Sequence, residues 1–188
     1  MKKLVAILVF SLNLGAALAQ APPAINLGVL NLPQEGPVWC WVAVARQIIA
    51  WKHQDLAMAP EQCALVAMSN NAPPAACCLQ MNPACNITGS IQQIQDLILN
   101  FGASYSSIAP PAHPMVLYHT LASGRPIILQ IESGPGTAHV VVLQGMTWYY
   151  TPSGPRAMLH INDPMNIYPV PVPFEDIASI WMSAIVVN

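Results

Sequence analysis

The sequence predicts an α+β fold in which a helical half precedes a sheet half. Between residues 36 and 124, apolar residues recur three and four positions apart in segments bounded by turn residues, which is typical of helices. From residue 126 to the C-terminus, β-branched residues gather in short runs separated by turns that contain Gly and Pro, which is typical of strands. Helices followed by sequential strands favour an α+β arrangement with an antiparallel sheet.

Residues 1–19 are predicted to be a signal peptide. Lys2 and Lys3 precede an uncharged, mostly apolar run over residues 4–18, and the segment ends in the small-x-small cleavage pattern Ala17-Leu18-Ala19. The apolar run is short for a membrane span; an uncleaved anchor is the alternative. We therefore expect a mature chain that begins at Gln20, is secreted or periplasmic, and has no membrane partner after cleavage.

The mature chain, residues 20–188, has the size of one domain. Without Lys2 and Lys3 it carries four Lys and Arg against eight Asp and Glu, a formal charge near −4. So few basic residues leave no patch for a nucleic acid, and no nucleic-acid partner is expected. Only 7% of all residues are charged, which indicates a compact apolar body, and we expect a monomer.

The helical half, about residues 34–124, follows a proline-bearing lead-in over residues 20–33. Local signals mark where its helices begin and end. Pro60 suits the first turn of a helix, Ser90 forms a capping box with Gln93, and Gly102 and Gly124 are stop signals. The expected helices are residues 40 to 51–53, 60–68, 91–102 and 114–122.

The sheet half, about residues 125–188, contains short β-branched runs. A glycine-rich loop over residues 133–136 separates the first two runs, and a Gly- and Pro-containing turn over residues 151–155 precedes the third. The expected strands are residues 126–131, 138–145, 158–162 and 180–187, with a single helical turn at 174–178.

Five cysteines in an oxidising compartment leave one thiol unpaired. Four of them lie close together in the sequence, and Cys40 stands apart, so Cys40 is expected to be free. The clustered cysteines are Cys63, Cys77, Cys78 and Cys85. Neighbouring cysteines are too close to bridge each other, so Cys63 is expected to pair with Cys77 or Cys78 and Cys85 with the other.

The two expected disulfides would order the loop over residues 70–86, which has no periodicity of its own. A zinc site is the alternative for the four cysteines. Their spacing lacks paired C-x-x-C motifs and no histidine lies among them. No metal or other cofactor is therefore expected.

Cys40 is a candidate nucleophile. Gly36-Pro37 is a turn signal, so Cys40 is expected at the N-terminus of the following helix. There the helix dipole and the unpaired N–H groups favour an anion, which makes a thiol easier to ionise. A cysteine nucleophile also needs a base within hydrogen-bond reach and a third group that orients the base.

His139 is the candidate base, because it opens a buried strand directly after the glycine-rich loop. A structural histidine with satisfied hydrogen bonds is the alternative. Asp163 ends the strand expected to pair with that of His139 and is the candidate orienting group. Asn162 is the alternative for this role, although its side chain would face the other side of the strand, and Asp163-Pro164 is also an ordinary turn.

Gln34 lies six residues before Cys40 and is the candidate oxyanion donor, together with the backbone N–H of Cys40. A solvated loop residue is the alternative for Gln34. Trp39 and Trp41 flank the thiol. We expect one of them to pack in the core and the other to line a substrate cleft.

Together these residues resemble the papain-like cysteine peptidases. Gln34, a five-residue spacer and Cys40-Trp41 match the papain signature, although papain has Gly-Ser where this chain has Val38-Trp39. Trp-Cys-Trp resembles bacterial members grouped with bacteriocin-leader peptidases and plant-pathogen effector proteases. In these proteins a strand that begins with His and runs through valines to Gly precedes one that ends in Asp-Pro, as His139 to Gly145 and Ile161 to Pro164 do here.

The resemblance implies a helical lobe that carries Cys40, a sheet lobe that carries His139 and Asp163, and an active-site cleft between them. It also implies a Cys-His-Asp triad that hydrolyses peptide bonds of a peptide or protein substrate. Two alternatives remain: a papain-like amidase or transferase acting on peptidoglycan or another amide, and a non-catalytic, disulfide-stapled binding module. Fast alkylation of the native thiol would favour an enzyme over a binding module.

Overall fold

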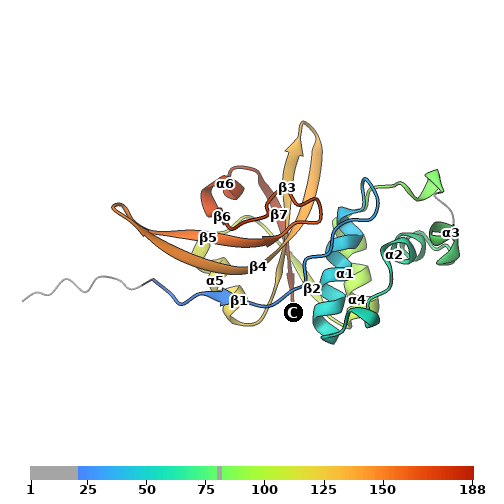
Figure 1. Ribbon diagram of the computed structural model, residues 1–188, viewed down its shortest axis with the longest axis horizontal. Helices are drawn as coiled ribbons and strands as arrows, with labels where there is room; N and C mark the ends of the chain where they lie inside the picture. Colours follow the sequence, from blue (N-terminus) through green and yellow to red (C-terminus); the bar gives the residue numbers. More distant parts are fainter. Residues whose placement is uncertain (1–20, 80–81) are drawn as a thin grey trace, which may run out of the picture.

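A computed structural model describes residues 21–79 and 82–188, so the predicted signal peptide lies outside the described residues. Within the described part, the molecule has a helical lobe at one end and a twisted antiparallel sheet at the other (Figure 1). The α+β class predicted from the sequence is confirmed. No helix among these residues is long and apolar enough to cross a membrane.

The helical lobe is built around α1, whose central residues are fully buried because apolar side chains cover most of its circumference. Helix α4 packs against it, and its predicted capping box is present: Gln93 N–H donates to Ser90 Oγ and Ser90 N–H donates to Gln93 Oε1. The helices of this lobe are α1 (Cys40–His53), α2 (Gln62–Ser69), α3 (Ala75–Cys78) and α4 (Ile91–Gly102), with 3₁₀ turns η1 (Leu56–Met58) and η2 (Pro83–Cys85).

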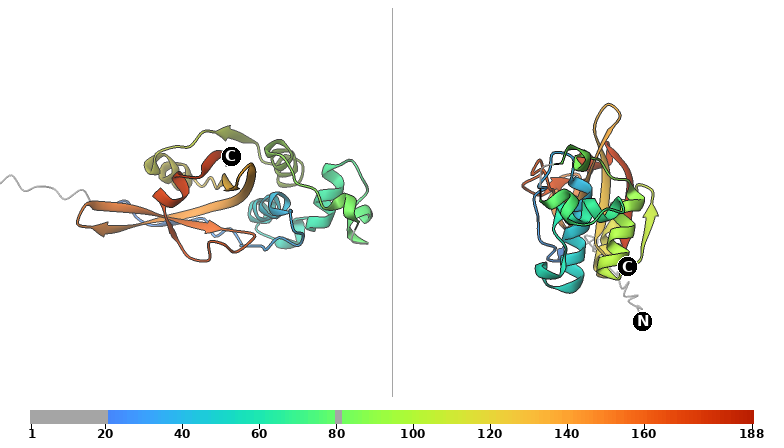
Figure 2. Two further views of the ribbon diagram at one scale, coloured as in Figure 1. Left: turned by 90° about the horizontal axis from the view of Figure 1, so that it is seen from above. Right: turned by 90° about the vertical axis from the view of Figure 1, so that its right-hand side faces the viewer.

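The sheet has seven strands, and every pairing is antiparallel. Its order is β2-β7-β3-β4-β5-β6, and β1 pairs with β4. The strands are β1 (Ile25–Asn26), β2 (Ser106–Ala109), β3 (Ile127–Gly134), β4 (Thr137–Thr151), β5 (Gly154–Asn162), β6 (Val172–Pro173) and β7 (Trp181–Val187). The long β4–β5 hairpin extends away from the helical lobe (Figure 2).

Helices cover both faces of the sheet. Successive side chains alternate between the faces: Val140 and Val142 pack with α1 and α4, whereas Val141 and Leu143 pack with α5 (Pro114–Ala122) and α6 (Phe174–Ala178). Near-continuous apolar runs in β3 and β4 follow from this double burial. The sheet therefore carries one hydrophobic core on each face.

The two short strands β1 and β2 are absent from the sequence prediction. Both depend on partners far along the chain: β2 pairs with β7, and β1 pairs with the middle of β4. Helix α5 also packs on the sheet, although the sequence assigns it to the helical half. Both β2 and α5 therefore lie with the sheet.

The disulfides join Cys63 to Cys78 and Cys77 to Cys85. This is one of the two pairings that the sequence leaves open, and Cys40 is the free cysteine among the described residues. The first bridge fastens the segment after α2 back onto that helix, and the second joins two positions within the segment. The segment also contains α3 and η2, which the sequence, lacking periodicity there, does not predict.

Candidate active site

Cys40 is the first residue of α1, as the sequence predicts, and its side chain is half-buried. The preceding turn closes through a 3.2 Å hydrogen bond from Trp39 N–H to the Gly36 carbonyl. At the first helical position, the Cys40 N–H has no carbonyl partner four residues earlier inside the helix. The free thiol and a backbone donor therefore belong to the same residue.

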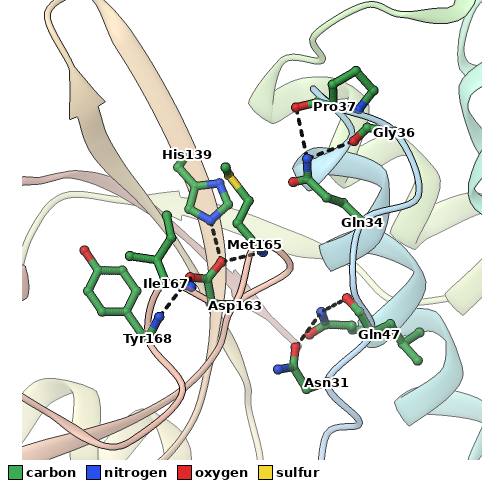
Figure 3. A network of polar contacts seen from close by, with 11 residues as sticks. Asn31, Gln34, Gly36, Pro37, Gln47, His139, Asp163, Met165, Ile167 and Tyr168 are labelled. Carbon is green, nitrogen blue, oxygen red and sulfur yellow. Dashed lines mark hydrogen bonds and ion pairs between the residues drawn. The ribbon is translucent and has the colours of Figure 1, made fainter.

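His139 and Asp163 meet across the sheet. His139 lies at the start of β4, and Asp163 follows the end of β5, which is paired with β4. The His139 Nε2 to Asp163 Oδ1 distance is 2.6 Å, and both side chains are buried (Figure 3). The Cys40 side chain also lies close enough to His139 to raise the pKa of the ring. The structure thus brings together the thiol, the base and the acid that the sequence singles out.

The Asp163 carboxylate is held by the loop that follows it. Oδ1 accepts the N–H of Met165 at 2.9 Å, and Oδ2 accepts the N–H groups of Ile167 and Tyr168 at 2.7 and 3.1 Å (Figure 3). Burial raises the pKa of this carboxyl, but its hydrogen bonds to His139 and to the loop outweigh burial and lower the pKa overall. Asp163 is therefore an oriented carboxylate rather than only a turn residue.

The charge on His139 is stabilised by its two partners. Burial lowers the pKa of the ring, but the hydrogen bond to Asp163 and the nearby Cys40 outweigh burial and raise the pKa from 6.5 to about 9. The His139 imidazolium is thus favoured at neutral pH. Because Nε2 faces Asp163, the other ring nitrogen is left for Cys40.

Asn162, the alternative orienting group, lies on the other side of the strand. Its Nδ2 donates to the Val29 carbonyl at 2.7 Å, and its Oδ1 accepts from Gln144 at 2.7 Å. These contacts tie the lead-in segment to the sheet. Asn162 therefore does not contact His139, as the alternation of side chains along a strand requires.

Gln34 lies beside the turn that leads into α1, but its amide does not point freely into a cleft. Nε2 donates to the carbonyls of Gly36 and Pro37 at 2.8 and 3.0 Å, which engages both amide hydrogens (Figure 3). Donation to an oxyanion requires the release of one of these bonds. The sequence could not show this competition, because it depends on the path of the turn.

The two tryptophans beside Cys40 act mainly as structural anchors. Trp41 is only 2% exposed and donates its indole N–H to the Ile87 carbonyl, so it is the core residue of the pair. Trp39 donates to the Cys85 carbonyl at 2.8 Å and is half-buried. Both rings therefore fasten the segment at the end of η2, residues 85–87, to the start of α1, a role that the sequence does not indicate.

A pocket borders Cys40 on the side of this fastened segment. Its walls come from both lobes and bear no ionisable side chain apart from Cys40 itself. The lining residues are Val38, Cys40, Trp41, Thr88, Gly89, Ile91, Ile94, Gln130, Ala138 and Val140. Gly89 lies so close to Trp41 that a Cβ added there would overlap the indole ring. Trp41 thus underlies this pocket while belonging to the core.

Comparison with known proteins agrees with this architecture. The model of the family described as papain-like cysteine protease AvrRpt2 matches residues 25–169. A solved structure described as a C39-like peptidase from Bacillus anthracis is similar, with a TM-score of 0.56 and 14% sequence identity over 89% of this chain and 98% of that chain. No curated protein matches the sequence.

A free thiol at a helix start facing a histidine on an antiparallel sheet is the arrangement of a papain-like cysteine peptidase, and the comparisons support that class. The family match extends over more than half of the sequence. This chain belongs to the papain-like cysteine proteases of the AvrRpt2 family.

Proposed function

We propose that this protein is a secreted cysteine peptidase that hydrolyses peptide bonds through Cys40, His139 and Asp163. The observation that carries the proposal is the position of His139, which lies beside Cys40 and hydrogen-bonds the Asp163 carboxylate. A nucleophile, a base and an orienting group connected in this order are what acyl transfer requires.

In the proposed mechanism the Cys40 thiolate, paired with the His139 imidazolium, attacks the carbonyl carbon of the scissile peptide. The carbonyl π electrons move to oxygen, and the oxyanion accepts hydrogen bonds from the Cys40 N–H and the Gln34 amide. His139 then protonates the leaving amine as the C–N bond breaks. Water, deprotonated by His139, attacks the thioester and releases the acid and the thiol.

The raised pKa of His139 suits the first half of this cycle. A ring that is protonated at neutral pH is ready to protonate the leaving amine, and its charge stabilises the thiolate beside it. Asp163 fixes the ring by accepting from Nε2 and is itself fixed by three backbone donors. This arrangement needs no metal or cofactor for the chemistry that we propose.

The substrate that we propose is a peptide or protein in extended form. The pocket beside Cys40 is lined mainly by apolar side chains and accepts an uncharged group next to the scissile bond. A peptidoglycan stem peptide also presents amide bonds, so casein turnover and release of soluble cell-wall fragments are measured side by side. Release of soluble cell-wall fragments without casein turnover would show that the substrate is peptidoglycan and would contradict the proposed peptide or protein substrate.

The matching experiment for catalysis is Cys40→Ala. We expect casein hydrolysis to be abolished, with a thermal midpoint close to that of the native chain, because the thiol is half-buried and forms no disulfide. Ser69→Ala in α2, away from the site, is the control and should hydrolyse casein at the native rate. Full activity of Cys40→Ala would contradict the assignment.

Secretion is part of this proposal. The two disulfides are consistent with an oxidising compartment, and the N-terminal sequence has the features of a signal peptide. Mass spectrometry of protein recovered from a bacterial periplasm or medium should find a chain that begins at Gln20. A full-length chain confined to the cytosol would contradict it.

A further inference from the structure

Gln62 is a fully buried polar residue for which the proposed mechanism has no role. It is the first residue of α2 and has no solvent exposure. A carboxamide in such a position is costly unless both of its ends find partners. The partners that it has therefore indicate why a glutamine stands there.

Both ends of the Gln62 carboxamide contact the main chain around Gln34. Nε2 donates to the Pro33 carbonyl at 2.7 Å, and Oε1 accepts the Glu35 N–H at 2.9 Å. The two contacts lie on either side of one residue, so the side chain brackets Gln34 much as a neighbouring strand would. Among the residues that the structure describes, the Gln62 side chain hydrogen-bonds no other part of the proposed oxyanion site.

The backbone of Gln34 is also fastened to the sheet lobe. Its N–H donates at 3.0 Å to the carbonyl of Pro164, the residue directly after Asp163. Helix α2, which carries Gln62, is itself held by the buried Leu65 and by the disulfide from Cys63. The main chain around Gln34 is thus fixed on one side by α2, through Gln62, and on the other by the segment that follows Asp163.

A second buried glutamine offers a comparison. Gln47 in α1 is equally buried and also holds the lead-in, through a 3.0 Å bond from Nε2 to the Leu32 carbonyl. Its Oε1 has no partner among the described residues. Gln47 therefore holds the same lead-in segment as Gln62, but it does not contact the main chain on both sides of Gln34.

We propose that Gln62 is a positioning residue that sets the main chain of Gln34 so that its amide, on releasing the Gly36 or Pro37 carbonyl, reaches the oxyanion. This inference rests on the proposed peptidase function. An oxyanion donor acts only when it lies at hydrogen-bond distance from the developing charge, and a displacement of about 1 Å can cost on the order of 10²-fold in rate. The two hydrogen bonds from Gln62 restrict the main chain of Gln34 and so prevent such a displacement.

The test compares Gln62→Met with Gln47→Met, since methionine replaces either carboxamide with an apolar chain of similar length. Both variants lose buried hydrogen bonds, so both should melt at lower temperature. Only Gln62→Met should lose kcat for a peptide substrate, by about 10- to 100-fold, with KM changed less than about threefold, because an oxyanion donor acts in the transition state.

Alkylation of Cys40 by iodoacetamide supplies a second readout, because this displacement forms no oxyanion. The alkylation rate of Gln62→Met should stay within about twofold of the native rate while its hydrolysis falls. Equal kcat losses in Gln62→Met and Gln47→Met, or parallel losses of alkylation and hydrolysis, would overturn the inference. Absence of both activities in the native protein would instead overturn the proposed function itself.

A double-mutant cycle with Gln34→Ala tests whether Gln62 acts through Gln34. If it does, the double variant should hydrolyse peptide no more slowly than Gln34→Ala alone; multiplied losses would contradict the inference. Gln62→Glu is the variant to use if Gln62→Met does not fold. Its carboxyl keeps an acceptor for the Glu35 N–H and, once protonated, regains a donor, so its rate relative to the native rate should rise as pH falls.

Discussion

At the scale of single residues, the pair His139 and Asp163 links the proposed catalysis to stability. The raised pKa of His139, about 9, means that its contribution to folding is fully present below its ordinary value of 6.5 and is lost as pH rises through 9. The lowered pKa of Asp163 means that its contribution is present above the ordinary carboxyl value and is lost as pH falls through the folded-state pKa. The fold therefore loses the stabilising contribution of His139 at high pH and that of Asp163 at low pH.

Asp163→Asn should separate these contributions. Loss of the carboxylate removes the strongest of the interactions that raise the His139 pKa, so the ring should titrate at lower pH and kcat should fall by about 10²- to 10⁴-fold. Proton NMR titration of the ring and the pH profile of hydrolysis measure the two effects. Asp176→Asn on the exposed face of α6 is the control, and an unchanged His139 titration in Asp163→Asn would contradict this account.

The sequence singles out Cys40, His139 and Asp163 as candidates because each carries a local signal: a helix start, a strand start and a strand end. Side-chain alternation also predicts that Asn162 faces away from His139, as it does. The orientation of the Gln34 amide has no such signal, since carbonyls of a turn compete for its hydrogens. The backbone donors at Met165, Ile167 and Tyr168 could not be predicted from the sequence either, because almost any residue can supply a backbone N–H.

At the scale of elements, the start of α4 meets the pocket beside Cys40. Ser90 caps the helix, and the preceding Gly89 touches the Trp41 ring that underlies the pocket. The capping box made this helix start predictable. Close contact between Gly89 and Trp41 was not predictable, because it joins residues that are far apart in the chain.

Gly89→Ala and Ser90→Ala form a matched pair of neighbouring substitutions. Ser90→Ala should cost about 1 kcal/mol of unfolding free energy through the lost cap and leave kcat/KM unchanged. Gly89→Ala should cost about 1–3 kcal/mol through overpacking and also lower kcat/KM several-fold, since Trp41 must move. Urea unfolding and peptide hydrolysis test the pair, and equal kcat/KM values would refute a link between Gly89 and the site.

At the scale of the whole molecule, the fold places a helix-borne thiol against a sheet-borne imidazole. Helix and strand order in the sequence predicts the two lobes, but not the pairing of β2 with β7 or the packing of α5 on the sheet, which depend on distant partners. The lead-in, with no periodicity of its own, joins the lobes through hydrogen bonds to Gln144 and Pro164 on one side and to Gln47 and Gln62 on the other. These contacts hold the two halves of the proposed triad in register.

The pH dependence of Cys40 alkylation tests the central claim most directly. With four cysteines in disulfides, iodoacetamide has a single target in the described part of the native chain, and mass spectrometry gives its rate. At pH ~6, well below the pKa of about 8.5 of an ordinary free thiol, the native protein should be labelled rapidly and His139→Ala at least tenfold more slowly. A native thiol that is labelled only after unfolding, or equally fast without His139, would contradict the account.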